Sequence, residues 1–316
     1  MEKKIKIGII GVGMVCTPLM KWFLMKKWKR GKNLFCYDAD PKKNFRDDIS
    51  KTAIVFICVP TPSNPDGSCN ISILESVIKE FPDKETRCVV IKSTVPPGTT
   101  ASLGRKYREK GHFLFNPEFL TEAKPWEDFI NPDRQIVAVG DVGDKESQGW
   151  AKIVLDILPA AEKTLRVCGV SSTEAELTKY AANVFGAMKV VFFNILAKRC
   201  DIFGANFENV RQMVVSDKRI GPSWSIVPYN GYFGYGGFCF IKDTDASIAS
   251  DEKMLNDIKE SGKKEVFSKA IDFFKAMRAF NETLLASQSL APQDVCFHDE
   301  ELKKKLNLRE KEKSDD

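Results

Sequence analysis

The chain has 316 residues, of which 43% are hydrophobic, 29% charged and 10% aromatic. This composition is typical of a globular protein and excludes both a disordered chain and a membrane-embedded one. The 48 lysines and arginines nearly balance 43 aspartates and glutamates, which argues against a dedicated nucleic-acid binder but allows anionic small-molecule ligands. The length predicts two domains.

Nine cysteines are spread along the chain, several of them inside apolar runs such as residues 53–59. None shows CxxC spacing, so we expect reduced thiols in a cytoplasmic protein and no disulfide framework. His112 and His298 are the only histidines, and we expect no metal site. No apolar stretch approaches the ~20 residues of a membrane span, and the first strand begins too early to leave room for a signal peptide.

Short apolar runs alternate with helical patterns through the first half of the chain. The runs predict strands over Ile5–Ile10, Leu34–Tyr37, Ala53–Val59, Cys88–Ile91, His112–Phe115 and Ile136–Val139. The helical patterns lie near residues 15–29, 71–80, 98–109 and 144–157. This alternation predicts an α/β fold, a doubly wound parallel sheet with helices on both faces, as a Rossmann-like domain over residues 1–170.

The second half of the chain changes to long helices. These helices are predicted over residues 173–200, 245–260 and 264–290. Residues 221–237 are rich in Gly, Pro, Tyr and Trp and predict an ordered loop. We therefore expect a mainly α-helical domain with a long central helix over residues 171–298, followed by a charged, disordered tail over residues 299–316.

The first strand leads directly into Gly11-Val12-Gly13-Met14-Val15-Cys16, which is the G-x-G-x-x-G pattern with cysteine at the third glycine position. The first glycine allows a tight turn, and the second lets backbone amides approach a pyrophosphate at a helix N-terminus. Asp38 follows the second strand, where an acid can accept hydrogen bonds from a ribose. The segment predicts NAD rather than NADP, bound by Gly11, Gly13, Met14, Val15 and Asp38.

A second glycine cluster surrounds Cys239, in Gly234-Tyr235-Gly236-Gly237-Phe238-Cys239-Phe240-Ile241-Lys242-Asp243. A cation and a carboxylate lie within four residues of the thiol, surroundings that can stabilise a thiolate nucleophile. Taken alone, such a cysteine is more often a buried, inert thiol.

This segment resembles the G-x-G-G-x-C-x-x-K-D signature of the nucleotide-sugar dehydrogenases, the UDP-glucose 6-dehydrogenase and GDP-mannose dehydrogenase family. Ile241 stands where the family usually has proline. Other motifs of the family occur in the same order. They lie at Val59–Pro62, Lys92–Thr99, Asn116–Glu122, Asn131–Arg134, Lys179–Asn183 and Arg219–Gly221.

Members of this family oxidise the C6 alcohol of a nucleotide sugar to a carboxylate and use two NAD per turnover. The resemblance therefore implies an NAD-dependent dehydrogenase in which Cys239 captures the aldehyde and later carries a thioester. It implies that Lys179 and Asn183, one helical turn apart, stabilise the oxyanion. It also implies that Asp243, Glu118 and Thr94 hold water or move protons.

The same resemblance implies residues that bind the ligands. For the cofactor it adds Pro60, Thr61, Thr94 and Glu122. For the substrate it implies Glu118, Phe119, Leu120, Lys179, Asn183, Arg219, Tyr235 and Gly236. Arg219 matches an arginine that reaches the substrate of a neighbouring subunit, so we expect a homodimer with the long helix as its contact.

UDP-glucose is the first substrate candidate, and UDP-N-acetylmannosamine and GDP-mannose remain open. Family members usually continue into another α/β domain that helps hold the nucleotide, and no strand–helix alternation follows Ala291. We expect a truncated form, in which a separate chain completes the nucleotide pocket or the pocket is reduced. Two other functions stay open: a β-hydroxyacid dehydrogenase, which needs no cysteine, and a non-catalytic NAD-binding subunit.

Overall fold

The computed structural model describes residues 5–84, 87–121, 123–160 and 165–296. The chain divides into two compact units, which we call the sheet unit (residues 1–62 and 69–179) and the helical unit (residues 63–68 and 180–316). The tail expected over residues 299–316 lies outside the described residues.

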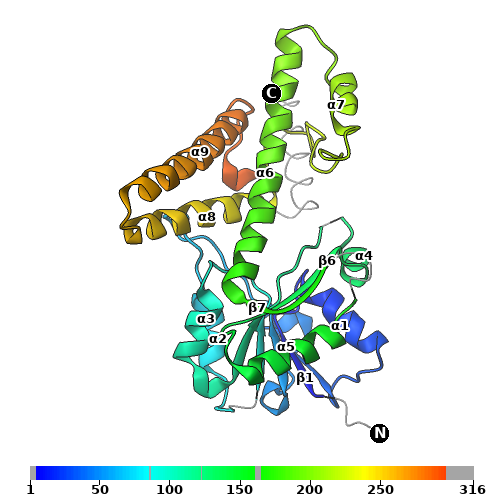
Figure 1. Ribbon diagram of the computed structural model, residues 1–316. Coiled ribbons are helices and arrows are strands. Elements are labelled where there is room, and N and C mark those ends of the chain that lie inside the picture. Colours follow the sequence, from blue (N-terminus) through cyan, green and yellow to red (C-terminus); the bar gives the residue numbers. More distant parts are fainter. Residues whose placement is uncertain (1–4, 85–86, 122, 161–164, 297–316) are drawn as a thin grey trace. The chain divides into compact units, whose positions relative to one another are not determined.

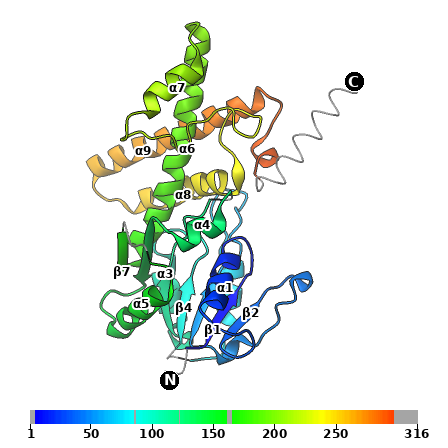
Figure 2. The same ribbon diagram turned by 90° about the vertical axis from the view of Figure 1, so that its right-hand side faces the viewer.

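The sheet unit is built on seven strands in the order β2-β1-β3-β4-β5-β6-β7 (Figures 1 and 2). The strands are β1 (Ile7–Ile10), β2 (Leu34–Tyr37), β3 (Ile54–Ile57), β4 (Cys88–Ile91), β5 (His112–Phe115), β6 (Arg134–Val139) and β7 (Leu165–Ser171). The chain leaves β1 first to one side and then to the other, so β1 and β3 flank the switch point at which open α/β sheets bind ligands.

Helices cover both faces of this sheet. They are α1 (Cys16–Met25), α2 (Ser72–Lys79), α3 (Thr99–Lys106), α4 (Pro125–Ile130), α5 (Lys145–Ile157) and the first part of α6 (Ser172–Ile202). Side chains of α1, α4 and α5 pack on one face with Ile7 and Ile9. Those of α2, α3 and α6 pack on the other face with Ile10. The alternation along β1 explains why all four of its residues are buried.

The predicted α/β class with a mostly parallel, doubly wound sheet is confirmed, with two differences at one edge. β6 runs antiparallel to β5, whereas an all-parallel sheet was expected. β7, the edge strand, was not predicted. Its residues are exposed or half-buried, so it lacks the continuous apolar run that marks a strand buried on both faces.

The helical unit holds the rest of α6 together with α7 (Phe207–Val215), α8 (Gly237–Asp257) and α9 (Ser261–Ala286). Its core joins Phe193 of α6 to Phe240 of α8 and Met277 of α9. Within this unit, α8 and α9 run crosswise to α6 (Figure 2). Gly186 permits this close packing, since a Cβ there would lie 2.6 Å from the Phe240 ring.

The helical unit differs from the prediction at the start of one helix and by the presence of another. α8 begins at Gly237, whereas a helix was expected only from residue 245, and α7 was not expected at all. Glycines are poor helix formers, so the glycine-rich approach to α8 masks its start. The correction matters because it places Cys239 in the first turn of a helix rather than in a loop.

α6 is long and apolar enough to meet the length and composition criteria for a membrane span, with a mean hydropathy of 1.4 over 18 residues. No such stretch was expected from the sequence. Of that window, 44% is buried within the protein, and α6 contributes Val184, Val191 and Phe193 to the core of the helical unit. Part of its apolar surface therefore fills a protein core.

Cys16 and Cys58 form a disulfide, which corrects the expectation that all thiols are reduced. Cys16 opens α1, and Cys58 directly follows β3. Their Cα atoms lie 6.3 Å apart, within the range that disulfides bridge. The sequence separation of 42 residues hides this pairing, because only the neighbouring positions of β1 and β3 in the sheet bring the two cysteines together.

Candidate active site

The turn after β1 has the geometry of a phosphate-binding loop. Gly11 has φ +84°, and a Cβ there would lie 2.6 Å from the carbonyl oxygen of Cys58. Only glycine fits such a turn. A Cβ at Gly13 would meet nothing within 4 Å, so this side of the loop is open. Met14 and Val15 lead into α1, whose N-terminus has no side-chain cap. Its first backbone amides therefore suit a phosphate, and the residues fit a dinucleotide.

Asp38 lies at the end of β2, next to this loop. Its carboxylate accepts hydrogen bonds from the backbone amides of Val12 at 2.8 Å and Asp40 at 2.9 Å, and from Nζ of Lys43 at 3.0 Å. Burial alone would raise the pKa of Asp38, but these hydrogen bonds outweigh it and keep the pKa below its ordinary value. Asp38 is therefore an ionised acceptor beside the glycine turn.

Pro60 and Thr61 follow β3, and Thr94 follows β4. The hydroxyl of Thr61 donates to the backbone carbonyl of Thr94 at 2.8 Å. This bond ties together the ends of two adjacent strands, so the expected cofactor residues Thr61 and Thr94 lie side by side. Pro60 is exposed, and Glu122 lies outside the described residues.

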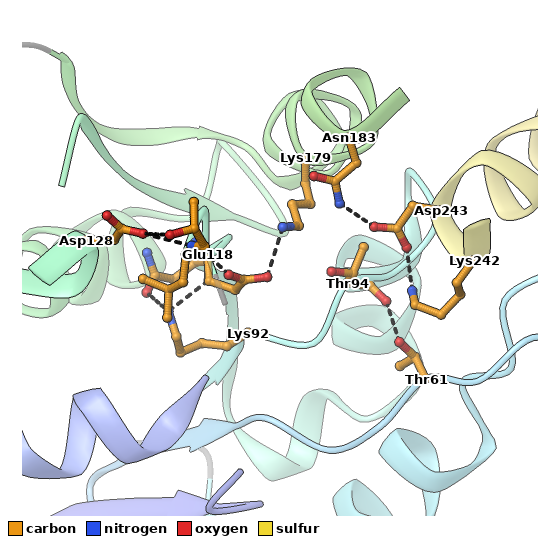
Figure 3. A network of polar contacts seen from close by, with 12 residues as sticks. Thr61, Lys92, Thr94, Glu118, Asp128, Lys179, Asn183, Lys242 and Asp243 are labelled. Atoms are coloured by element: carbon orange, nitrogen blue, oxygen red, sulfur yellow. Dashed lines mark hydrogen bonds and ion pairs between the residues drawn. The ribbon is translucent and has the colours of Figure 1, made fainter. Parts of the chain in front are cut away.

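An ion pair joins Glu118 to Lys179 within the sheet unit (Figure 3). Oε1 of Glu118 accepts from Nζ of Lys179 at 2.9 Å, and the two side chains are only 9% and 4% exposed. Burial would raise the pKa of Glu118, but the charge and hydrogen bond of Lys179 hold it below its ordinary value. The carboxylate is thus held ionised and can accept a proton or orient water.

Phe119 and Leu120 follow this carboxylate directly. The Phe119 ring lies under the guanidinium of Arg134, 3.6 Å from ring centroid to Cζ, and Nζ of Lys179 lies 5.5 Å from the same centroid. The backbone amide of Leu120 donates to Oε2 of Glu118 at 2.9 Å. Contacts to Arg134 and to Glu118 therefore hold this segment in place. A backbone that binds a ligand needs such support.

A second polar group lies within the helical unit. Nδ2 of Asn183, on α6, donates to Oδ2 of Asp243, on α8, at 2.5 Å. Oδ1 of Asp243 is paired with Nζ of Lys242, and Asp243 is fully buried. Figure 3 shows both contacts. Since α6 is one continuous helix, Lys179 and Asn183 stand one turn apart on one face of it.

Cys239 lies half-buried in the first turn of α8, one turn before Asp243. A helix N-terminus stabilises negative charge, such as that which develops when a sulfur nucleophile is displaced. This placement supplies a physical reason for nucleophilic character that the sequence pattern alone lacked.

The loop before α8 is held by two buried asparagines. Oδ1 of Asn194 accepts from the amide of Gly234 at 3.0 Å. Oδ1 of Asn281 accepts from the amide of Tyr235 at 2.7 Å, and its Nδ2 donates to the Tyr235 carbonyl at 3.1 Å. Gly236 is closely surrounded, because a Cβ there would lie 2.1 Å from the hydroxyl of Tyr232 and 2.9 Å from the backbone carbonyl oxygen of Val295. These contacts fix the approach to Cys239.

Arg219 is the expected substrate residue that stands apart from these groups. Its side chain is 90% exposed and pairs with Asp217, with Nη2 and Oδ2 2.6 Å apart. Conversely, sequence reasoning assigned no role to Lys92, which Figure 3 shows near Glu118, or to Asn116, with which Lys92 forms a buried hydrogen bond. The sequence did offer one indication of Lys92, since a lysine directly follows the fully apolar strand β4.

The doubly wound sheet, its glycine turn and the acid after β2 define the class of dinucleotide-binding α/β proteins. Two family models narrow this class. Residues 40–154 match the NAD-binding domain of the UDP-glucose/GDP-mannose dehydrogenase family, and residues 173–260 match the central domain of the same family. The chain belongs to this family, and the cofactor expected from the sequence is the one that the matching domain binds.

Curated relatives agree with this assignment. The chain is 37% identical over 218 residues to the UDP-glucose 6-dehydrogenase of Pseudomonas aeruginosa, covering 66% of this chain and 46% of that protein. It is 34% identical to UDP-glucose 6-dehydrogenase 1 of Glycine max, covering 68% of this chain and 45% of that protein. The chain thus spans about half the length of the curated relatives it matches.

Solved structures agree at the level of the fold. A UDP-glucose dehydrogenase from Pyrobaculum islandicum matches with a TM-score of 0.68 and 27% identity, covering 90% of this chain and 71% of that one. A UDP-D-ManNAc dehydrogenase from Pyrococcus horikoshii has a TM-score of 0.69 but only 19% identity, covering 90% and 70%. At that identity the likeness concerns the fold alone.

Proposed function

We propose that this chain is an NAD-dependent nucleotide-sugar 6-dehydrogenase that oxidises UDP-glucose to UDP-glucuronate. The observation that carries the proposal is Cys239 in the first turn of α8, one turn before the buried Asp243. The names of the Pseudomonas aeruginosa and Glycine max relatives support UDP-glucose as the first candidate among nucleotide sugars.

The reaction requires two oxidations at one carbon, and NAD supplies the hydride acceptor for each. After the first oxidation, Sγ of Cys239 adds to the C6 aldehyde, and the carbonyl oxygen takes up a proton to give a thiohemiacetal. Loss of a second hydride and of that proton leaves a thioester. Water then attacks the thioester carbon, and its collapse releases the carboxylate and returns the Cys239 thiol.

The remaining residues have roles that match their chemistry. Lys179 and Asn183 provide an ammonium and an amide for the developing oxyanion. Glu118, Asp243 and Thr94 orient water and accept protons. For sugar binding we propose Phe119, Leu120, Tyr235, Gly236 and, from a second subunit, Arg219. For NAD we propose Gly11, Gly13, Met14, Val15, Asp38, Pro60, Thr61, Thr94 and Glu122.

The proposed organisation assigns NAD binding to residues 1–170 and substrate and dimer contacts to residues 171–298. We place the protein in the cytoplasm as a homodimer, joined through exposed apolar side chains of α6 such as Phe185 and Phe192, which are 54% and 52% exposed. We also propose that a separate chain contributes to the nucleotide pocket.

The test is NADH production from NAD with UDP-glucose, UDP-N-acetylmannosamine and GDP-mannose, run beside Cys239→Ala. The proposal expects two NADH for each UDP-glucuronate formed and loss of acid production in Cys239→Ala, while NAD binding measured by calorimetry is retained. Cys168→Ala, which removes another half-buried cysteine, is the matched control and should keep its activity.

Each other outcome has a distinct meaning. Preference for GDP-mannose or UDP-N-acetylmannosamine would retain the reaction and replace the substrate. Acid production that survives in Cys239→Ala would contradict the covalent route. No turnover of any of the three sugars, although NAD binds, would contradict catalysis by this chain alone.

A further inference from the structure

Lys92 is a charged side chain in a place where charge is costly. It follows β4 directly and is only 4% exposed. Its Nζ donates to Oδ1 of Asn116 at 2.7 Å and lies 3.3 Å from the Asn116 carbonyl oxygen. Burial lowers the pKa of Lys92 to about 8. An apolar side chain of similar length would avoid this desolvation, so a buried lysine here calls for a compensating interaction.

The partner of Lys92 is itself held rigidly. Asn116 is fully buried, and its Nδ2 donates to Oε1 of Gln135 at 3.0 Å and to the carbonyl of Ile136 at 2.7 Å. Nε2 of Gln135 in turn donates to the carbonyl of Pro159 at 3.2 Å. With its amide nitrogen committed, Asn116 turns its oxygen toward Lys92. The network thereby fixes the start of the turn that leads to Glu118.

Glu118 lies between two cations within the sheet unit. Lys179 approaches from α6 and bonds its Oε1, while Lys92 interacts with the carboxylate electrostatically from the end of β4. Arg134 of β6 is engaged with the ring of the neighbouring Phe119. Lys92 and Lys179 also repel each other. The negative charge of Glu118 offsets this repulsion, because it attracts both lysines.

We propose that Lys92 is a positioning residue that holds the Asn116–Glu118 turn and keeps the Glu118 carboxylate charged and seated against Lys179. It touches neither cofactor nor sugar and acts through Glu118. The consequence for catalysis rests on the proposed function. The interaction between Lys92 and Glu118 does not depend on the proposed function, since it exists in the protein without substrate.

The first experiment measures that coupling without activity. Melting temperatures are compared for the wild type, Lys92→Met, Glu118→Gln and the double variant. We expect Lys92→Met to lower the melting temperature when Glu118 is present, by roughly 3 °C or more. In the Glu118→Gln background, Lys92→Met should leave the melting temperature unchanged or raise it, because the buried Lys92 cation has already lost its anionic partner there. Equal changes in both backgrounds would overturn the proposal.

The second experiment is the pH profile of kcat/KM for UDP-glucose oxidation. Without the Lys92 charge, the acid limb should move upward by about one pH unit, which means a roughly tenfold loss at low pH. The wild type and Lys92→Met should converge above about pH 8, where Lys92 itself loses its proton. A merely structural role would lower activity equally at every pH, and that result would overturn the proposal.

Lys84→Met is the matched control, since Lys84 also donates to a backbone carbonyl, that of Thr52 at 3.0 Å, and has no acidic partner among the residues that the structure describes. It should leave the acid limb unchanged. A wild-type protein that oxidises no nucleotide sugar would defeat the proposed function, and the melting temperatures alone would then decide the role of Lys92.

Discussion

Asp38 illustrates how much one residue can decide. Its carboxylate is 7% exposed and already accepts from two backbone amides and a lysine, yet it stands beside the open side of the glycine turn. A carboxylate has about four lone-pair sites, so it can still accept from a ribose hydroxyl. A 2′-phosphate in the same place would meet a like charge. This asymmetry favours NAD over NADP.

We therefore expect Asp38→Asn to weaken NAD binding by about tenfold, equivalent to the loss of ~1.4 kcal/mol. The difference in affinity between NAD and NADP should become smaller. Calorimetric titration with both dinucleotides measures this directly. Asp47→Asn is the control, because Asp47 also accepts a hydrogen bond from a backbone amide, that of Cys36 in β2 at 2.9 Å, but is not an expected cofactor residue. Equal loss of NAD and NADP binding in Asp38→Asn would contradict the assigned role.

At the residue scale, sequence reasoning predicts a site residue where a motif names a residue type at a stated position. Glu118, Lys179, Asn183 and Asp243 were all expected, and the structure forms two hydrogen-bonded pairs from them. Lys92 was missed because its importance depends on burial and on two partners that lie 24 and 26 residues further along the chain, and neither is visible in a local pattern.

At the scale of elements, the start of α3 is capped by another helix. Oε2 and Oε1 of Glu176, on α6, accept from the backbone amides of Gly98 at 2.5 Å and Thr100 at 2.9 Å. These bonds satisfy amides that a helix N-terminus leaves without partners. Burial nevertheless raises the pKa of Glu176 to about 7. The contact that joins α6 to α3 is therefore sensitive to pH near neutrality.

The sign of this effect follows from proton linkage. Between about pH 4.5 and pH 7 the folded protein holds a proton on Glu176 that the unfolded chain has released. Stability from this group is thus lost as pH rises through that window. From pH 5 to pH 8 we expect Glu176 to reduce the free energy of unfolding by about 2–3 kcal/mol.

Urea unfolding of the wild type and Glu176→Gln at the two pH values measures this contribution. The decrease in the free energy of unfolding between pH 5 and pH 8 should be smaller in Glu176→Gln than in the wild type by about 2–3 kcal/mol. Glu174→Gln, an exposed neighbour on α6 whose pKa is lowered, should behave like the wild type over this range. The same pH dependence in all three proteins would rule out the effect.

The ends of strands and helices can be predicted where they depend on the local sequence, but not where tertiary packing decides them. The buried strands β2, β4 and β5 were predicted to the residue, and β1 and β3 were predicted too long, since an apolar run between turns is a local signal. The start of α8 was misjudged because Gly236 and Gly237 favour a loop by propensity. Packing of Phe240 against Gly186 and the hydrogen bonds from Asn194 and Asn281 override that preference.

At the scale of the whole molecule, α6 carries exposed apolar side chains at helical spacing. Phe185, Phe192, Ile195 and Ile202 are between 40% and 80% exposed. Apolar side chains recurring every three to seven residues form a stripe that a second helix can cover. This stripe is the physical basis for the homodimer in the proposed function.

We expect sedimentation equilibrium to give twice the chain mass for the wild type and the single-chain mass for Phe185→Asp/Phe192→Asp. Buried carboxylates at such a contact would cost several kcal/mol. Val266→Asp, on α9 and 73% exposed, is the matched control and should remain dimeric. A monomeric wild type, or a double variant that stays dimeric, would refute this contact.

The sequence by itself determined the α/β class, the positions of its buried strands along the chain and the glycine turn, and it predicted the residues of the site, because these depend on local periodicity and on motifs of neighbouring residues. Only the tertiary structure decided the antiparallel edge of the sheet, the Cys16–Cys58 disulfide, the helical setting of Cys239 and the network around Lys92. Each of these depends on groups distant in sequence that meet in space, and on the burial that sets the cost of their charges.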